Sequence, residues 1–468
     1  MKDILNPSFG VATIRISNQL SYMDRQEEAL LAIEEATELY QQLVADQPAA
    51  FNPDLAGCLS NLSNCLYNLG HQEEALLAIE KAIRLYRQLA ADRPAAFNSD
   101  LARSINILSN CLSYLGHQKE ALLAIEEAIE LYRQLAADLP AALNPDLAHS
   151  LNNLSHHLSK LGLREEALLA IEEAIELHRQ LAADQPAAFN PDLARSLNNL
   201  SACLSDLGHQ EKALLAIEEA IELYRQLAAD RPAAFNPDFA SSLNNLSNHL
   251  SYLGRQEEAL LAIEEAIKLY RELAADRPAA FNLDLAMSLN NLSACLSNLG
   301  HQEEALLAIE EAIELYRQLA GARPAAFNPD LARSLNNLSN HLSNLGHQEE
   351  ALLAIEEAIK LYRQLAADQP AAFNPGLARS LKDISTCLSN LGCQEEALLA
   401  IEEPIELYRR LAAVRPAVFT TALANSLKIL SKCLSGLSRP EEASLATEEA
   451  IQLSQGSMAE HSIMLRSK

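Results

Sequence analysis

The sequence lacks tryptophan altogether, and its 12 tyrosines and 10 phenylalanines make up only 5% of its 468 residues. Its core must therefore be built from leucine, isoleucine and alanine. Eight cysteines in a chain of this length do not indicate a disulfide scaffold. None of the 14 glycines stands in a phosphate-binding loop or a dinucleotide-binding motif, so we expect no cofactor.

Positive charge is also scarce, because 36 basic residues stand against 63 acidic ones and leave a net charge of −27. A strongly acidic surface repels phosphate backbones, so nucleic acid is not an expected partner. The chain has no uninterrupted apolar run long enough to cross a membrane, and its first residues carry no signal-peptide pattern. We therefore expect a cytoplasmic protein without a membrane partner.

What the sequence has instead is a repeat. The phrase HQEEALLAIEEAIELYRQLAADRPAAFNPDLARSLNNLSN recurs with small changes, and a step of 46 residues separates successive copies. A chain of 468 residues exceeds one ordinary hydrophobic core, so the repeat predicts a stacked array. The ten copies open at Arg25, His71, His117, Leu163, His209, Arg255, His301, His347, Cys393 and Arg439.

Each copy carries signals for two helices. Asn236 followed by Pro237 predicts a helix start, with asparagine as the N-cap and proline at the first helical position. Gly254 predicts its end as a C-cap glycine. A second helix is expected from Gln256 to just before Pro278, which would close the unit.

The apolar stripe of the second helix is wide, because Leu260, Leu261, Ile267 and Tyr270 join Ala259 and Ile263. One helical hairpin cannot bury so wide a stripe, but a stack of hairpins can. No segment alternates apolar and polar residues in the way of a β-strand. The sequence therefore predicts an all-α fold.

This pattern resembles the tetratricopeptide repeat family. The large apolar positions of the family's first helix fall on Leu197, Leu200 and Leu204, and its small position falls on Ser201. Ala213 and Ala220 match its alanines in the second helix. The family's proline is displaced to Pro232, which lengthens the second helix as in the kinesin light chain subclass.

The resemblance implies a right-handed α-α superhelical solenoid of about ten helix-turn-helix repeats. They would form one array over residues 1–454, followed by a C-terminal tail at 455–468. The expected repeats start near residues 10, 56, 102, 148, 194, 240, 286, 332, 378 and 424. It also implies a non-catalytic scaffold whose first helices line a concave groove for a protein or peptide.

The groove-facing positions of the family carry repeated asparagines and most of the groove's charge. An asparagine ladder can pair with the backbone of an extended peptide, or it can simply be polar and exposed. The asparagines are Asn106, Asn152, Asn198, Asn244, Asn290 and Asn336. The cations are Arg103, Lys160, Arg195, Arg333, Arg379, Lys382, Lys428 and Lys432, whereas Asp206 is the only acid at these positions. This excess predicts an acidic peptide ligand, held toward the C-terminal end.

One column of the first helices mixes cysteine and histidine. It contains Cys65, Cys111, Cys203, Cys295, Cys387 and Cys433, together with His157, His249 and His341. Packed helices lie about 8–10 Å apart, whereas zinc ligands lie about 2 Å from one ion, so one ligand per repeat does not converge on a metal. We expect half-buried packing here, no metal site, solvated Glu218-Glu219 pairs, and a packed rather than ligand-binding column of tyrosines.

Two other functions compete with the scaffold. Similar long arrays are attached to nucleotide-binding signalling ATPases in fungi and bacteria, so a sensor or regulatory array is one alternative. End-to-end self-association is the other, because the last helix still carries Leu445, Ile451 and Leu453. A proline inside a helix removes a backbone hydrogen bond, so Pro404 predicts a kink near 400–404 and a soft C-terminal end.

Overall fold

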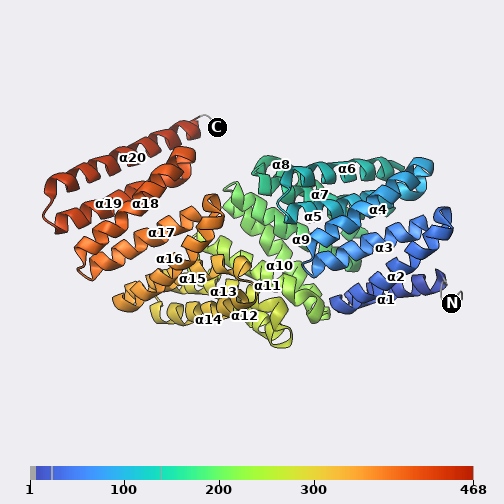
Figure 1. Ribbon diagram of the computed structural model, residues 1–468, viewed down its shortest axis with the longest axis horizontal. Helices are drawn as coiled ribbons and strands as arrows, with labels where there is room; N and C mark the ends of the chain where they lie inside the picture. The colour runs from blue at the N-terminus through green and yellow to red at the C-terminus, as the bar shows by residue number, and fades with distance from the viewer. Residues whose placement is uncertain (1–6, 23–24, 139, 467–468) are drawn as a thin grey trace. The chain divides into compact units, whose positions relative to one another are not determined.

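The computed structural model describes residues 7–22, 25–138 and 140–466 (Figure 1), and over these residues the chain forms 20 helices and no strand. The helices are α1 Pro7–Tyr22, α2 Gln26–Asp46, α3 Pro48–Asn68, α4 Gln72–Asp92, α5 Pro94–Tyr114, α6 Gln118–Asp138, α7 Pro140–Leu161, α8 Arg164–Asp184, α9 Pro186–Asp206, α10 Gln210–Asp230, α11 Pro232–Tyr252, α12 Gln256–Asp276, α13 Pro278–Leu299, α14 Gln302–Ala322, α15 Pro324–Leu345, α16 Gln348–Asp368, α17 Pro370–Asn390, α18 Gln394–Val414, α19 Pro416–Gly436 and α20 Pro440–Arg466.

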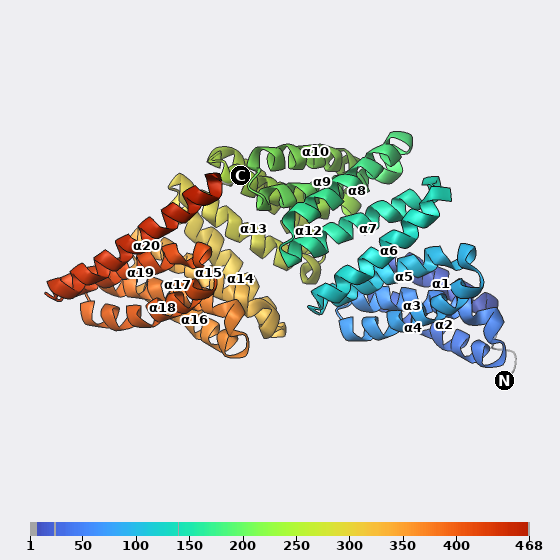
Figure 2. The ribbon, with the colours of Figure 1, turned by 90° about the horizontal axis from the view of Figure 1, so that it is seen from above.

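The helices group into two compact units, Met1–Asp238 and Phe239–Lys468. Within each unit, consecutive helices pack as antiparallel hairpins, and successive hairpins stack in chain order (Figure 2). The predicted all-α array of helix-turn-helix repeats is therefore confirmed. That all ten repeats behave as one domain stays a prediction.

A glycine makes the tight turn between the two helices of a hairpin. Gly254 has a φ of +76°, a left-handed conformation that glycine adopts without strain. Beyond it, the N–H of Arg255 donates to the carbonyl of Leu250 at 2.9 Å. The side-chain Nε2 of Gln256, the residue that opens the second helix, donates to the carbonyl of Ser251 at 3.1 Å. The predicted C-cap and the predicted start at Gln256 are both present.

The predicted start of the first helix was wrong. α11 begins at Pro232 rather than after Asn236, and a single residue, Arg231, joins it to α10. The N–H groups of Ala234 and Phe235 already bond to the carbonyl of Arg231. Pro232 suits the first helical position because the N–H it lacks would have no partner there. Pro278, expected to close the unit, opens α13 in the same way.

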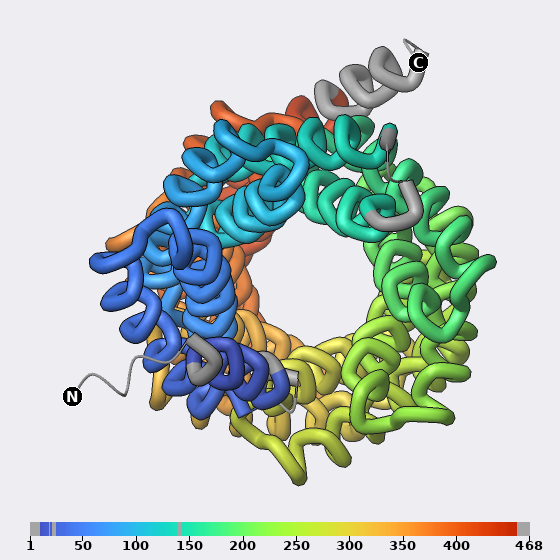
Figure 3. Tube along the Cα trace, turned by 90° about the vertical axis from the view of Figure 1, so that its right-hand side faces the viewer, coloured from blue at the N-terminus to red at the C-terminus, as the bar shows by residue number. Residues whose placement is uncertain are grey.

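The two helices of each hairpin form two layers within each unit (Figure 3). Several odd-numbered helices touch the next odd-numbered helix, as α3 touches α5 and α15 touches α17. Even-numbered neighbours make no such close approach in the described ranges. The odd-numbered helices therefore lie on the inner side of each curved stack, and we call their free side the inner surface.

Alanine, isoleucine and tyrosine fill the space between the layers. In α12, Ala259, Ile263 and Ala266 are 0% exposed and Tyr270 is 4% exposed. The hydroxyl of Ser247 donates to the carbonyl of Ala259 at 2.8 Å and ties the first helix to the second. Leu261 was expected in this stripe, but its exposed fraction is 67%. It points away because the alanines and isoleucines already define the packed face.

Two expectations concern the C-terminal end. α18 continues through Pro404, which is buried, and the structure shows no break in this helix. The expected tail continues the last helix instead, because α20 extends to Arg466 while 467–468 lie outside the described residues. Among the helices described, none is long and apolar enough to span a membrane.

Candidate functional site

The predicted asparagine ladder lies between neighbouring odd-numbered helices. Asn106, Asn152, Asn290 and Asn336 are only 5–8% exposed, and Asn198 and Asn244 are half-buried. The side-chain oxygens of five of these asparagines accept hydrogen bonds of 2.9–3.2 Å from the next repeat. The acceptor–donor pairs are Asn106–Asn153, Asn152–Asn199, Asn244–Asn291, Asn290–Asn337 and Asn336–Ser380. The ladder thus joins one repeat to the next.

The cations other than the half-buried Lys382 are exposed, and aspartates meet several of them. Arg103 lies 3.5 Å from Asp100 and 3.7 Å from Asp146 of the following repeat. Arg333 pairs with Asp330 at 2.7 Å, and Arg195 pairs with Asp192. Lys160 instead donates to the hydroxyl of Ser113 at 3.3 Å.

These aspartates were missed as groove residues. Their column contains Asp54, Asp100, Asp146, Asp192, Asp238, Asp284 and Asp330. Burial raises the pKa of Asp100, and the nearby Arg103 opposes that shift. Because each first helix begins one turn earlier than expected, this column joins the inner surface. The spacing of aspartate and arginine by three residues was the sequence signal.

The aspartate column stops after α15. Gly376 occupies its place in α17, and a Cβ atom there would lie 2.5 Å from Cε1 of Tyr362, so no side chain fits without moving that ring. Ala422 occupies the place in α19. In the described part of the chain, no carboxylate pairs with Arg379, Lys428 or Lys432.

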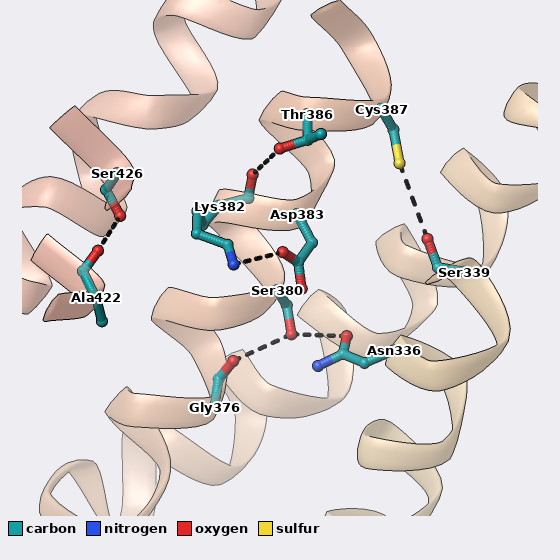
Figure 4. A network of polar contacts seen from close by, with 10 residues as sticks. All are labelled: Asn336, Ser339, Gly376, Ser380, Lys382, Asp383, Thr386, Cys387, Ala422 and Ser426. Carbon is teal, nitrogen blue, oxygen red and sulfur yellow. Dashed lines mark hydrogen bonds and ion pairs between the residues drawn. The ribbon is translucent and has the colours of Figure 1, made fainter. Parts of the chain in front are cut away.

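Polar contacts in this region are shown in Figure 4, where Lys382 reaches Asp383 at 2.9 Å. Ser380 donates to Asn336 at 2.9 Å and to the carbonyl of Gly376 at 3.1 Å. α19 contains two lysines and no acidic residue. Arginine–aspartate pairs therefore neutralise charge on the inner surface at α5, α9 and α15, whereas α11 and α13 carry an aspartate without an arginine or lysine. Over α17 and α19 the inner surface is positive.

The cysteine and histidine column is fully buried rather than half-buried. Its members are at most 7% exposed, and at least seven of the nine lie near a serine of the preceding repeat. Nε2 of His341 lies 2.7 Å from Oγ of Ser293, and Sγ of Cys295 lies 3.3 Å from Oγ of Ser251. Over the residues whose positions are described, no three potential ligands converge on a metal position.

Two further columns lie on the even-numbered helices, a column of tyrosines and a column of glutamate pairs. The eight tyrosines from Tyr40 to Tyr408 are 0–8% exposed, and burial raises the pKa of Tyr316 to about 12. The second glutamate of the pair Glu218-Glu219 accepts from Arg179 of the preceding repeat at 2.8 Å. The same ion pair recurs along the even-numbered helices, for example between Arg317 and Glu357 at 2.8 Å.

The chain was also compared with known proteins. A family model described as tetratricopeptide repeat matches residues 55–93, 147–187, 193–232, 239–277, 285–330 and 331–371, together more than half of the chain. A model of anaphase-promoting complex subunit 5 matches the shorter segments 5–47, 104–140 and 378–414. No curated protein sequence matches the chain.

Two of the solved structures compared with the chain share its fold at low sequence identity. The apo form of RapI is 12% identical with a TM-score of 0.58, and the match covers 86% of this chain and 98% of RapI. The apo quorum sensor NprR from B. thuringiensis is 16% identical with a TM-score of 0.53, covering 82% of this chain and 97% of NprR. A third structure contains TPR-like repeats, nearly identical to one another, of a putative kinesin light chain from P. anserina. It is 16% identical to this chain with a TM-score of 0.37, and the match covers 47% of this chain and 96% of that structure.

Proposed function

We propose that this chain, which belongs to the tetratricopeptide repeat family, is a non-catalytic scaffold that binds an extended acidic segment of a partner protein. The segment would lie on the inner surface of α17 and α19. One observation carries the proposal: the aspartates that neutralise the inner arginines end at Asp330, and the cations continue beyond them.

Arg379, Lys428 and Lys432 supply this positive region, and Arg379 and Lys428 are exposed. An exposed charge without a counter-ion keeps its full attraction for a carboxylate, whereas Arg333 must first give up Asp330. The asparagine ladder, being engaged between repeats, sets the spacing of this surface. Asn198 and Asn244 lie in α9 and α11, outside this positive surface, so the proposal assigns them no contact with the segment.

The proposal is tested by fluorescence anisotropy with an aspartate- and glutamate-rich peptide and with a lysine-rich peptide of matched length. We expect the acidic peptide to bind more tightly and its affinity to fall as salt is raised. Arg379→Glu combined with Lys428→Glu should weaken binding by about 1 kcal/mol or more per site, or roughly fivefold each.

Lys268→Glu combined with Lys360→Glu is the matched control, because both lysines are exposed on even-numbered helices, α12 and α16, and the two reversals change the net charge by the same amount. It should leave the affinity within about twofold. Equal binding of the acidic and basic peptides, or equal losses in the inner and control variants, would overturn the proposal.

A further inference from the structure

A leucine column runs along the even-numbered helices on the side away from the inner surface. It consists of Leu31, Leu77, Leu123, Leu169, Leu215, Leu261, Leu307, Leu353, Leu399 and Leu445, and each is 57–69% exposed. Single exposed leucines are ordinary on protein surfaces. Here, however, every repeat presents one at the same position, so each unit displays a row of apolar side chains.

Glutamates surround each leucine of this column. Leu307 has Glu303 and Glu304 one turn before it and Glu310 and Glu311 one turn after it, and all four are exposed. α14 as a whole carries five glutamates and one arginine. Each of the ten leucines has at least three glutamates at these four flanking positions. The acidic charge of the protein is thus concentrated around an apolar row.

A pocket lies beside the leucine column in each unit. In the first unit, a pocket of about 340 Å³ lies between α8 and α10 and is lined by Leu168, Leu200 and Leu215. In the second unit, one of about 450 Å³ is lined by Ile359, Ile384 and Leu399. The ion pairs Arg179–Glu219 and Arg363–Glu403 form part of the walls. Equivalent residues line both pockets, so the leucine and the pocket form one repeated feature.

We propose that this outer surface, made of the leucine column, its glutamates and the adjacent pockets, binds a basic amphipathic segment of a partner protein. Apolar side chains of the segment would pack on the exposed leucines and enter the pockets, while its lysines or arginines would meet the surrounding glutamates. Because the surface differs from the inner surface in place and in charge, the inference stands independently of the acidic-segment proposal.

Charge selects this occupant over two others. A second copy of the chain presents the same glutamates, so two outer surfaces would repel each other. A membrane with anionic headgroups would be repelled for the same reason. A basic segment, in contrast, removes the repulsion among the glutamates that crowd each leucine.

The test uses the full chain and a synthetic helical peptide of about 20 residues, roughly six turns, with leucines on one face and lysines elsewhere. Two comparison peptides replace either all lysines by glutamate or all leucines by serine. We expect the leucine–lysine peptide to bind and both comparison peptides to bind at least about tenfold more weakly.

Leu307→Gln, Leu353→Gln and Leu399→Gln, combined in one variant, remove three adjacent column members. Since these side chains are 66–69% exposed, the variant should keep the parent's circular dichroism spectrum and melting temperature. Peptide affinity should fall by about tenfold or more. Met287→Gln is the matched control, because Met287 is 41% exposed on α13 and lies outside the column; its affinity should be unchanged.

Several results would overturn this inference. Unchanged peptide binding by the triple variant would exclude the leucine column, and equal binding of the glutamate-bearing peptide would exclude charge recognition. If light scattering showed a parent dimer that the triple variant dissolves, a second copy would be the occupant instead. Sedimentation with anionic vesicles that depends on the three leucines would assign the surface to a membrane. Arg379→Glu serves to separate the two surfaces, because it should leave this binding intact.

Discussion

Acid should loosen one repeat of the first unit before the others, and His178 is the reason. This residue stands in α8 at the position of the tyrosine column, and it is 3% exposed. Its Nδ1 lies 3.0 Å from Oγ of Ser196. Burial, reinforced by the neighbouring Arg195 and opposed by Asp192, lowers the pKa of His178 from its ordinary 6.5 to about 4.

The size of the effect follows from this shift. Above pH 6.5 the imidazole is neutral whether the repeat is folded or unfolded, so the repeat has its full stability. Between pH 6.5 and 4 only the unfolded repeat binds the proton, and stability falls as the pH falls. The loss from His178 is about 2 kcal/mol at pH 5 and about 3 kcal/mol once both states are protonated.

Hydrogen exchange resolved by helix is the appropriate assay, because a repeat array opens locally. After correction for intrinsic rates, the amides of α8 and α9 should exchange roughly thirtyfold faster at pH 5 than at pH 7 through His178 alone. Burial also lowers the pKa of His157 in α7 to about 4, so its contribution adds to the same repeat.

Substitutions taken from neighbouring repeats isolate each histidine. His178→Tyr restores the residue found at Tyr132 and Tyr224, and His157→Cys restores the residue found at Cys111 and Cys203. Each variant should remove its share of the pH dependence in α7–α9, while the remaining titrating groups are unchanged. If the His178→Tyr variant kept the parent's pH dependence, protonation of the buried imidazole would not be the cause of the acid destabilisation. That result would refute the reasoning.

Two further predictions concern stability. Pro404→Ala should stabilise α17–α20 by about 1 kcal/mol, because regaining about 3 kcal/mol of helix stability outweighs the loss of two buried methylenes of about 0.8 kcal/mol each. Ala358→Pro, the reverse change one repeat earlier, should destabilise the protein by about 3 kcal/mol. Equal melting temperatures of the parent and Pro404→Ala would show that the proline is unstrained. Leu200→Ala should lower the free energy of unfolding by about 1–3 kcal/mol, less than for a fully buried leucine, because Leu200 is half-buried beside Leu204 and Ala213. Hydrogen exchange should localise the lost protection to α8–α10. Faster exchange throughout both units would contradict the prediction.

The fold was predictable because its determinants are local and repeated. A glycine such as Gly254 ends a helix by its own backbone preference, and the alanine and isoleucine positions of α12 follow the helical period. Eight of the ten copies carry this glycine. The helix start was misassigned because Pro232 and Pro237 are both acceptable first residues by local rules, and the packed array uses the earlier one.

The candidate sites were less predictable, because they depend on which helix faces meet. Leu260 and Leu261 are indistinguishable by hydrophobicity, yet Leu260 packs against the core cluster that contains Ala308, whereas Leu261 is 67% exposed. The asparagine ladder was identified by position, but its bonds to the next repeat require knowledge of the helix spacing. The pairing of Arg103 with Asp146 likewise joins two repeats. It was not predicted because each first helix begins one turn earlier than expected, and this earlier start places the aspartate beside the arginine.

The distribution of charge between the layers decides what the protein can bind, and the net charge of −27 conceals it. α14 carries five glutamates and one arginine, whereas α15 carries one aspartate and one arginine. α19 carries two lysines and no acidic residue. Since exposed charges act over a Debye length of about 10 Å, a ligand on one layer responds mainly to that layer rather than to the total. An acidic protein can therefore hold an acidic segment on its inner surface and a basic one on its outer surface, and raising the salt concentration should weaken both.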